Sequence, residues 1–263
     1  MFLGASPCKE KNVLLQYASD LHLETPGNLE YVLDGGLAVK GDVLVLAGDL
    51  VSLAHPQRID PFWDWCSKHF RETYAVPGNH EFYETDASVF GARWVWQLRH
   101  NVRYAQNQVV RIGDADLILS TLWSRINPLW ETACLDYVND FSCIKWQGHL
   151  LEAREFNAMH EACLTFLKEA LAASTAQKRI VVTHHVPTAQ AVSERYRGST
   201  LESAFVAELG EWIAGSGADT WIFGHSHANM NVRIGTTDIV CNQLGSTVKR
   251  KASGWRPDAV IEI

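Results

Sequence analysis

The chain has 263 residues, 47% of them hydrophobic and 20% charged, with a formal net charge of −7. This is ordinary globular composition, and the acidic balance argues against a general electrostatic grip on nucleic acid or an anionic membrane. No apolar run approaches the ~20 residues of a membrane-spanning helix, and residues 1–12 carry charges where a signal peptide would be apolar. We therefore expect a soluble, cytoplasmic protein.

Strand-like and helix-like segments alternate along the chain. In chain order, strands are expected at 13–18, 43–47, 73–76, 109–112, 116–121, 180–182, 221–223, 231–234, 238–241 and 259–263, and helices at 61–70, 86–100, 147–173 and 201–214. The mixture of βαβ units and hairpins favours two packed sheets flanked by helices. The irregular segment 124–146 is typical of a functional loop or lid, and a cover of aromatic side chains over the core explains it equally well.

Residues able to bind metal ions follow five of the expected strands. They occur as Asp20-Leu21-His22, Gly48-Asp49, Gly78-Asn79-His80-Glu81, Thr183-His184-His185 and Gly224-His225-Ser226-His227. Ligands of open α/β sheets gather at the carboxyl ends of the strands. Because the groups run from Asp20 to His227 and must meet in one place, we expect residues 1–263 to form a single domain. The six cysteines are scattered without a CxxC pair, so reduced thiols are expected in place of a zinc knuckle or a disulfide framework.

Carboxylate, amide and imidazole ligands together suit divalent cations that activate water. Two such ions need a shared ligand, and Asp49 is the natural bridge. In Asp20-Leu21-His22 and His225-Ser226-His227, the first and third side chains of an extended segment point the same way. Each histidine taken alone is more typical of an ordinary, partly buried residue, but the joint occurrence in this order indicates a dinuclear metal hydrolase.

These five blocks resemble the signature of the calcineurin-like metallophosphoesterase family, which reads DxH, GD, GNH(E/D), a later H and GHxH. The resemblance implies a four-layer α/β/β/α sandwich with a two-metal centre at the sheet edges. It further implies the ligands of two ions of Mn, Fe or Zn. Asp20, His22, Asp49 and His227 would hold one ion, and Asp49, Asn79, His184 and His225 the other.

Three shorter runs are similar to bacterial members near the cyclic-nucleotide phosphodiesterase group. They are Thr-Leu-Trp at 121–123, Asn-Asp-Phe at 139–141 and His-His-Val-Pro at 184–187. Relatives often carry Asn-Pro-Arg-Gly-Tyr near the C-terminus, whereas this chain has Asn-Gln-Leu-Gly-Ser at 242–246. That departure removes an arginine and a tyrosine that could contact substrate.

The expected reaction is hydrolysis of a phosphodiester or phosphomonoester of a small molecule or nucleotide through a metal-bound hydroxide. Asp49 and His80 are the candidate catalytic residues. His80 could protonate the leaving alkoxide, with Glu81 or Asp49 orienting its other ring nitrogen. The alternative for His80 is a purely structural hydrogen bond.

Substrate contacts are expected from Asn79, His80, His185 and Arg195. A solvated loop explains Arg195 and its neighbours equally, and a solvated turn explains the Lys-Arg-Lys run at 249–251.

Three other functions stay open. A phosphoprotein phosphatase usually shows GDxxDRG, where this chain has Leu-Val-Ser-Leu-Ala after Asp49. A nuclease is less attractive for an acidic chain. A non-catalytic scaffold is disfavoured because every expected ligand position is occupied.

Overall fold

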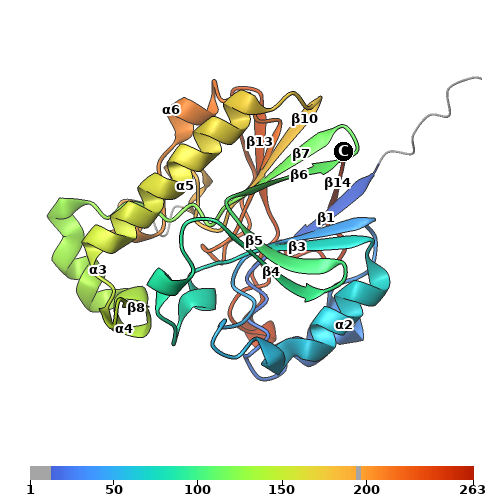
Figure 1. Cartoon of the computed structure of the whole chain (residues 1–263), viewed down its shortest axis with the longest axis horizontal. Helices are drawn as coiled ribbons and strands as arrows, with labels where there is room; N and C mark the ends of the chain where they lie inside the picture. Colours follow the sequence, from blue (N-terminus) through green and yellow to red (C-terminus); the bar gives the residue numbers. More distant parts are fainter. Residues whose placement is uncertain (1–12, 194–196) are drawn as a thin grey trace, which may run out of the picture.

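The computed structural model describes residues 13–193 and 197–263 and contains two six-stranded sheets packed face to face (Figure 1). The first sheet has the order β14 (Val260–Glu262), β1 (Leu14–Ala18), β2 (Val43–Ala47), β3 (Glu72–Val76), β5 (Val102–Gln106) and β4 (Trp94–Arg99). The second has the order β12 (Val232–Ile234), β13 (Thr237–Cys241), β11 (Thr220–Phe223), β10 (Lys178–Val182), β7 (Ala115–Leu119) and β6 (Gln108–Ile112). In each sheet the inner strands run parallel, and the outermost strand at either edge is antiparallel to its neighbour.

Helices cover both outer faces of the sheet pair. α5 (Ala153–Ala173) lies along the second sheet and α2 (Asp60–His69) along the first (Figure 1). The shorter elements are α1 (Asn28–Tyr31), α3 (Glu131–Tyr137), α4 (Asp140–Cys143), α6 (Gly210–Ile213) and the hairpin β8 (Lys145–Trp146) and β9 (His149–Leu150). Single helical turns occur at Val32–Gly36, Pro56–Ile59, His80–Phe82, Ala87–Val89, Pro128–Trp130, Ala189–Ala191, Glu202–Ala204 and Val248–Arg250.

Three apolar clusters hold the layers together. In β2, Val43 and Val45 face the second sheet, while Leu44 and Leu46 face α2, because successive strand side chains point to opposite faces. The cluster between the sheets also contains Leu117 and other side chains of β7 and β10, and α5 supplies the third cluster against the second sheet. Strands buried on both faces read as continuous apolar runs, as the sequence has them. The expected four-layer α/β/β/α sandwich is confirmed.

The helix expected at 86–100 is wrong, because this segment forms the turn Ala87–Val89 and the edge strand β4. Val95 is 51% exposed and Trp96 is 36% exposed, so β4 carries apolar residues on both faces. The alternation that marks a half-buried strand is therefore missing, and antiparallel pairing with β5 determines the structure. β5 itself was not expected.

The helix expected at 201–214 is also largely wrong, since only the turn Glu202–Ala204 and the four-residue α6 form. Between them the backbone pairs with Val186: the Val186 amide donates to Phe205, and the Ala207 amide donates back to Val186. These bonds to a distant segment replace the helical ones.

The long helix expected at 147–173 is confirmed from Ala153 onward, where Glu152 and Glu155 form a capping box. The preceding residues belong to the β8–β9 hairpin, whose turn has Gln147 and Gly148 at positive φ. The expected helix at 61–70 is confirmed as α2.

Segment 124–146 covers the core in part, as one of the two expectations had it, and the functional role stays a prediction. Phe141 is buried in the core beside α5, whereas Tyr137 is 77% exposed. Tyr137 borders a cavity beside the candidate ligands, whereas Phe141 does not.

Within residues 13–193 and 197–263, no helix is both long and apolar enough to cross a membrane. The five cysteines in the same ranges are free, as expected; Cys8 lies outside them.

Candidate metal centre

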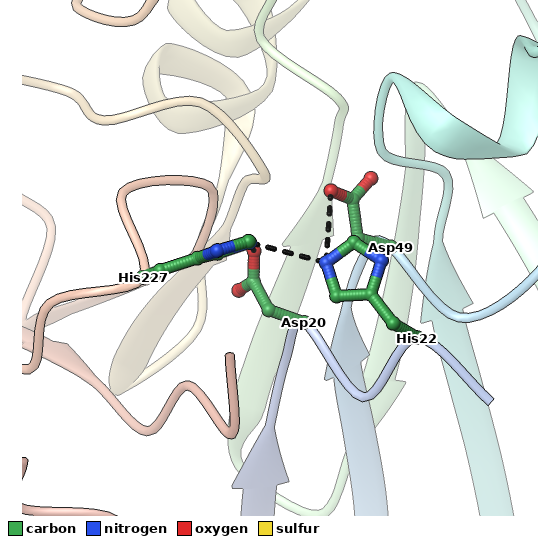
Figure 2. Close-up of side chains that lie close together, drawn as sticks. All are labelled: Asp20, His22, Asp49 and His227. Atoms are coloured by element: carbon green, nitrogen blue, oxygen red, sulfur yellow. Dashed lines mark hydrogen bonds and ion pairs between the residues drawn. The ribbon is translucent and has the colours of Figure 1, made fainter. Parts of the chain in front are cut away.

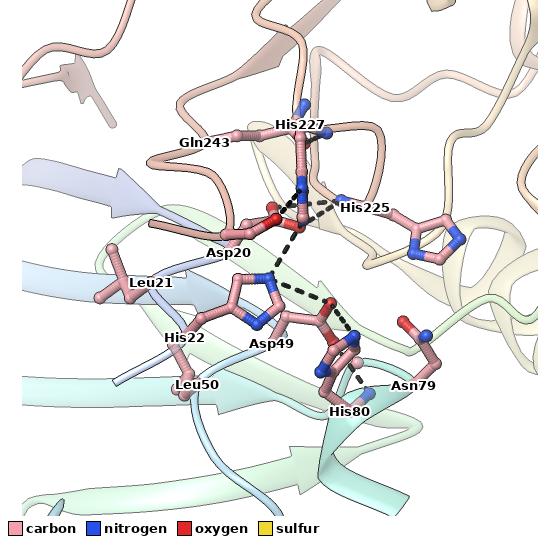
Figure 3. Close-up of polar contacts among 12 residues, drawn as sticks. Asp20, Leu21, His22, Asp49, Leu50, Asn79, His80, His225, His227 and Gln243 are labelled. Carbon is pink, nitrogen blue, oxygen red and sulfur yellow. Dashed lines mark hydrogen bonds and ion pairs between the residues drawn. The ribbon is translucent and has the colours of Figure 1, made fainter. Parts of the chain in front are cut away.

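Five parallel strands deliver the candidate ligands to one edge of the sandwich. Figure 3 labels all of these ligands except His184. β1 is followed by Asp20 and His22, β2 by Asp49 and β3 by Asn79. The second sheet contributes His184 after β10, and His225 and His227 after β11. All seven side chains predicted as ligands therefore lie together, because the carboxyl ends of both sheets meet at this edge.

One group consists of Asp20, His22, Asp49 and His227 (Figure 2). The Nε2 atoms of His22 and His227 are 3.1 Å apart. His227 Nε2 is 3.3 Å from Asp20 Oδ1, and His22 Nε2 is 3.7 Å from Asp49 Oδ2. Four potential ligand atoms thus face one small volume.

A second group lies on the other side of the Asp49 carboxylate and contains Asp49, Asn79, His184 and His225. His184 Nε2 is at its centre, 2.9 Å from Asn79 Oδ1, 3.1 Å from His225 Nδ1 and 3.3 Å from Asp49 Oδ1. Asp49 Oδ2 therefore faces the first group and Oδ1 the second. Asp49 Oδ1 also accepts a hydrogen bond from the His80 backbone amide at 3.0 Å.

The donor set fits divalent ions. Two imidazole nitrogens that bind one ion at ~2.1 Å lie roughly 3.0–3.4 Å apart, close to the 3.1 Å of both histidine pairs. His184 Nδ1 lies 2.8 Å from the Ala47 carbonyl oxygen, which accepts only if this nitrogen carries the proton. The Nε2 lone pair of His184 is then free for a cation. His227 Nδ1 is similarly engaged by the Ser246 hydroxyl at 2.9 Å.

The charges of the group are strongly coupled. Burial alone would lower the pKa of His22 and His184, but carboxylates outweigh it and raise both pKa values from 6.5 to about 9. The carboxylates are Glu24, Asp49 and Asp20 for His22, and mainly Asp49 for His184. Burial would raise the pKa of Asp49, yet the adjacent imidazoles, His184 foremost, hold it well below its usual range. In the metal-free protein, protons on His22 and His184 therefore neutralise the carboxylate charge that a bound cation would otherwise neutralise.

The backbone at this edge is strained. Ten non-glycine residues in the described part of the chain have positive φ, and five of them are candidate ligands: Asp20, His22, Asp49, His225 and His227. Such conformations cost about 1–3 kcal/mol each and persist only where the surroundings enforce them. Glycine is required at position 78 for a steric reason, because a Cβ there would collide with Asp49 Oδ1. A Cβ at Gly224 would approach Asp20 Oδ2 to 2.7 Å.

Glu81 does not orient His80, which corrects the expected role. Its carboxylate is fully buried and accepts hydrogen bonds from the backbone amides of Asp49 at 2.9 Å, Leu50 at 2.7 Å and Gly78 at 2.7 Å. Burial and the nearby Asp49 charge raise the pKa of Glu81 to about 7. Glu81 thus joins the loop that carries Asp49 to the loop that carries Asn79.

The His80 ring lies between the carboxylates of Asp49 and Glu24. Its Nε2 is 3.9 Å from Asp49 Oδ2, and its Nδ1 is 3.9 Å from Glu24 Oε1. The ring stacks on Tyr83 and is 31% exposed, so it borders both the metal ligands and open space. Glu24 was missed in the sequence, because it lies in the turn that follows His22, where side chains have no regular period.

Asp140 is a second residue that sequence reasoning missed as part of the site. Its Oδ1 accepts hydrogen bonds from Asn79 Nδ2 at 2.8 Å and from the Tyr83 hydroxyl at 2.9 Å. Because the amide nitrogen of Asn79 is engaged there, the amide oxygen faces His184. Asp140 is buried, which raises its pKa, and its Oδ2 has no hydrogen-bond partner. The Asn-Asp-Phe run at 139–141 was the available signal.

His185 and Arg195 were also expected to contact substrate, and neither is among the described residues of the cavity wall. His185 has no exposed surface, packs against Trp123, Phe156 and His225, and does not border the cavity, so the structure does not favour a direct substrate contact. Arg195 lies outside the described residues.

Gln243, from the block that departs from relatives, accepts a hydrogen bond from the His227 backbone amide at 2.7 Å and so supports a candidate ligand.

A cavity of about 390 Å³ opens beside the centre. Its wall includes Asp49, Asn79, His80, Tyr83, Tyr137, Val138, Asn139, Asp140, Val186, Val192, Ser199, Leu201, Glu202, Phe205, Val206, His225, Ser226 and His227. This volume is within the range of small-molecule sites.

Comparisons with known proteins agree with this geometry. The model of the calcineurin-like phosphoesterase family matches residues 17–229. The uncharacterized protein L509 of Acanthamoeba polyphaga mimivirus is 25% identical over 281 residues, which cover 95% of this chain and 96% of that protein. The crystal structure of phosphopantetheinyl hydrolase (PptH) from Mycobacterium tuberculosis is similar with a TM-score of 0.65 and 15% identity, covering 95% of each chain, a likeness of fold alone. The chain belongs to the calcineurin-like phosphoesterase family.

Proposed function

We propose that the chain is a binuclear metallophosphoesterase that hydrolyses a phosphomonoester or phosphodiester of a small molecule. Asp20, His22, Asp49 and His227 would hold one ion, and Asp49, Asn79, His184 and His225 the other. The observation that carries this proposal is that the two Asp49 oxygens face different ligand groups. The ligands come from both sheets, which supports a single domain. The mixed oxygen and nitrogen donors suit Mn²⁺, Fe and Zn²⁺ alike.

Bound ions would neutralise charge on the phosphoryl group and lower the pKa of a water molecule that attacks phosphorus. The protein side chains have the complementary tasks. Asp49 keeps the two groups of ligands together, and Asn79 and His227 border the cavity where an ester would enter. His80 presents an exposed imidazole at the same wall, so it can give a proton to the departing alcohol oxygen.

The cavity supports a small ester over a phosphoprotein. Its volume of about 390 Å³ admits a compact ligand and leaves no room for a folded protein segment. The absence of the GDxxDRG block after Asp49 agrees with this preference.

The direct test is hydrolysis of bis(p-nitrophenyl) phosphate and p-nitrophenyl phosphate by protein stripped of metal and reloaded with Mn²⁺. We expect turnover of at least one ester, and loss of that turnover in Asp49→Ala, because the variant lacks the shared carboxylate. The ratio of the two rates assigns diester or monoester preference. A metal-loaded protein that turns over neither ester would contradict the proposal and favour a binding role.

His80→Ala is expected to lower kcat by about 10²–10³-fold while the bound metal is retained, since a general acid contributes on this order. The loss should be smaller for p-nitrophenyl esters than for alkyl esters, because p-nitrophenolate leaves without a proton. Rates and metal content measured on the same sample separate the two effects. Loss of metal from the variant would show that His80 serves the structure of the centre.

Asp140→Ala is expected to weaken binding of the ion held by Asn79 about 10- to 100-fold, because residues that orient a ligand have effects of this size. Tyr83→Phe is the matched control, since it removes the other hydrogen bond to Asp140 and leaves the Asn79 contact. Metal dissociation constants of the two variants and the wild type provide the measurement. Equal constants in all three would exclude this role of Asp140.

Metal binding at pH 7.5 is expected to release about two protons, because the raised pKa values keep His22 and His184 protonated in the metal-free protein. Apparent affinity should therefore rise with pH up to about 9 and level off above. Because the pKa values of His22 and His184 are raised on folding, protonation of these residues stabilises the metal-free fold fully below pH 6.5. This stabilisation disappears as the pH rises to 9.

Calorimetry in two buffers with different ionisation enthalpies counts the released protons. His149→Gln, a change in the exposed strand β9 of the β8–β9 hairpin, is the control and should release the same number. Metal binding without proton release would refute the protonated state of these histidines.

A further inference from the structure

The wall of the cavity has two chemically different parts. One part is formed by the metal-site residues and His80. The other part is apolar and consists of Val138, Val186, Val192, Leu201, Phe205 and Val206. The two parts meet at His225, whose ring stacks on Phe205 with centroids 4.8 Å apart. The apolar part therefore begins directly beside a candidate metal ligand.

The described residues of the apolar part offer no compensation for a negative charge. None of the described residues that border the cavity is a lysine or an arginine. The charged residues there, besides the centre itself, are the carboxylates of Asp140 and Glu202. Arg197 donates a hydrogen bond to the Val192 carbonyl oxygen and is not among the wall residues. A second phosphate or carboxylate in this region would be desolvated beside like charges, which is costly.

We propose that this apolar wall binds the alcohol part of the substrate, and that this alcohol is uncharged and apolar close to the ester oxygen. The substrate class is thus a phosphate ester of an alkyl or aryl alcohol, and the described wall disfavours nucleoside polyphosphates. The inference rests on the proposed function, because the phosphoryl group must be held at the metal centre.

Alkyl phosphonates test the wall without requiring turnover, because their carbon–phosphorus bond is not an ester. The phosphonate group would bind at the metals, and the alkyl chain would extend along the wall. Burial of each methylene group is expected to lower the dissociation constant about fourfold. Calorimetry on the Mn²⁺-loaded protein with methyl-, propyl-, butyl- and octylphosphonate measures this series, which should level off once the cavity is full.

A charged probe of nearly equal size provides the matched comparison. 3-Phosphonopropionate differs from butylphosphonate mainly by a terminal carboxylate, and we expect it to bind at least tenfold more weakly. Leu201→Asn should flatten the chain-length series, whereas Leu129→Asn should not, because Leu129 is 82% exposed and does not border the cavity. If Leu201→Asn fails to fold, the wild-type series still decides the question.

The outcomes separate the two proposals. A flat series, or equal binding of 3-phosphonopropionate and butylphosphonate, would overturn the apolar wall even if esters are hydrolysed. A steep series in a protein that hydrolyses no ester would leave the wall in place and overturn the proposed function.

Discussion

The buried carboxylate of Asp49 is the constraint on which the structure of the site depends. It is only 1% exposed, and a buried anion is stable only with compensating partners. Imidazoles face its two oxygens from opposite groups, and the backbone amide of His80 donates to one of them. One side chain thus links the loops that follow β1, β2, β3 and β10.

Three carboxylates that lie within one network have different surroundings and hence different roles. Asp49 faces imidazoles, which keep it ionised. Glu81 accepts backbone amides and lies near the Asp49 charge, so its pKa is raised to about 7, and its function is to connect two loops. Asp140 is buried against Asn79 and Tyr83, and its raised pKa has burial as the main cause. Environment, and not residue type, assigns these roles.

The strained loops are possible because the sandwich beneath them is regular. Each central strand is buried on both faces by apolar layers, so the ends of the strands are fixed relative to one another. Five candidate ligands at positive φ are held on that rigid base, and small residues such as Gly78 leave room for the Asp49 carboxylate. The free energy gained by packing the sheets thus offsets the strain that presents ligands at one edge.

The sequence by itself determined the layers, most of the strands and which candidate ligands lie together at one edge. Continuous apolar runs that end in Asp, Asn or His predict buried parallel strands, and the ends of such strands must meet at one edge. Prediction from the sequence failed where the backbone hydrogen-bonds to a distant segment, as in β4 and in the segment that pairs with Val186. Only the tertiary structure decided that Glu81 binds backbone amides and that Asp140 orients Asn79. It also decided that the centre borders an apolar wall. These contacts join residues from loops far apart in the chain, whose conformations have no period that a sequence pattern could carry.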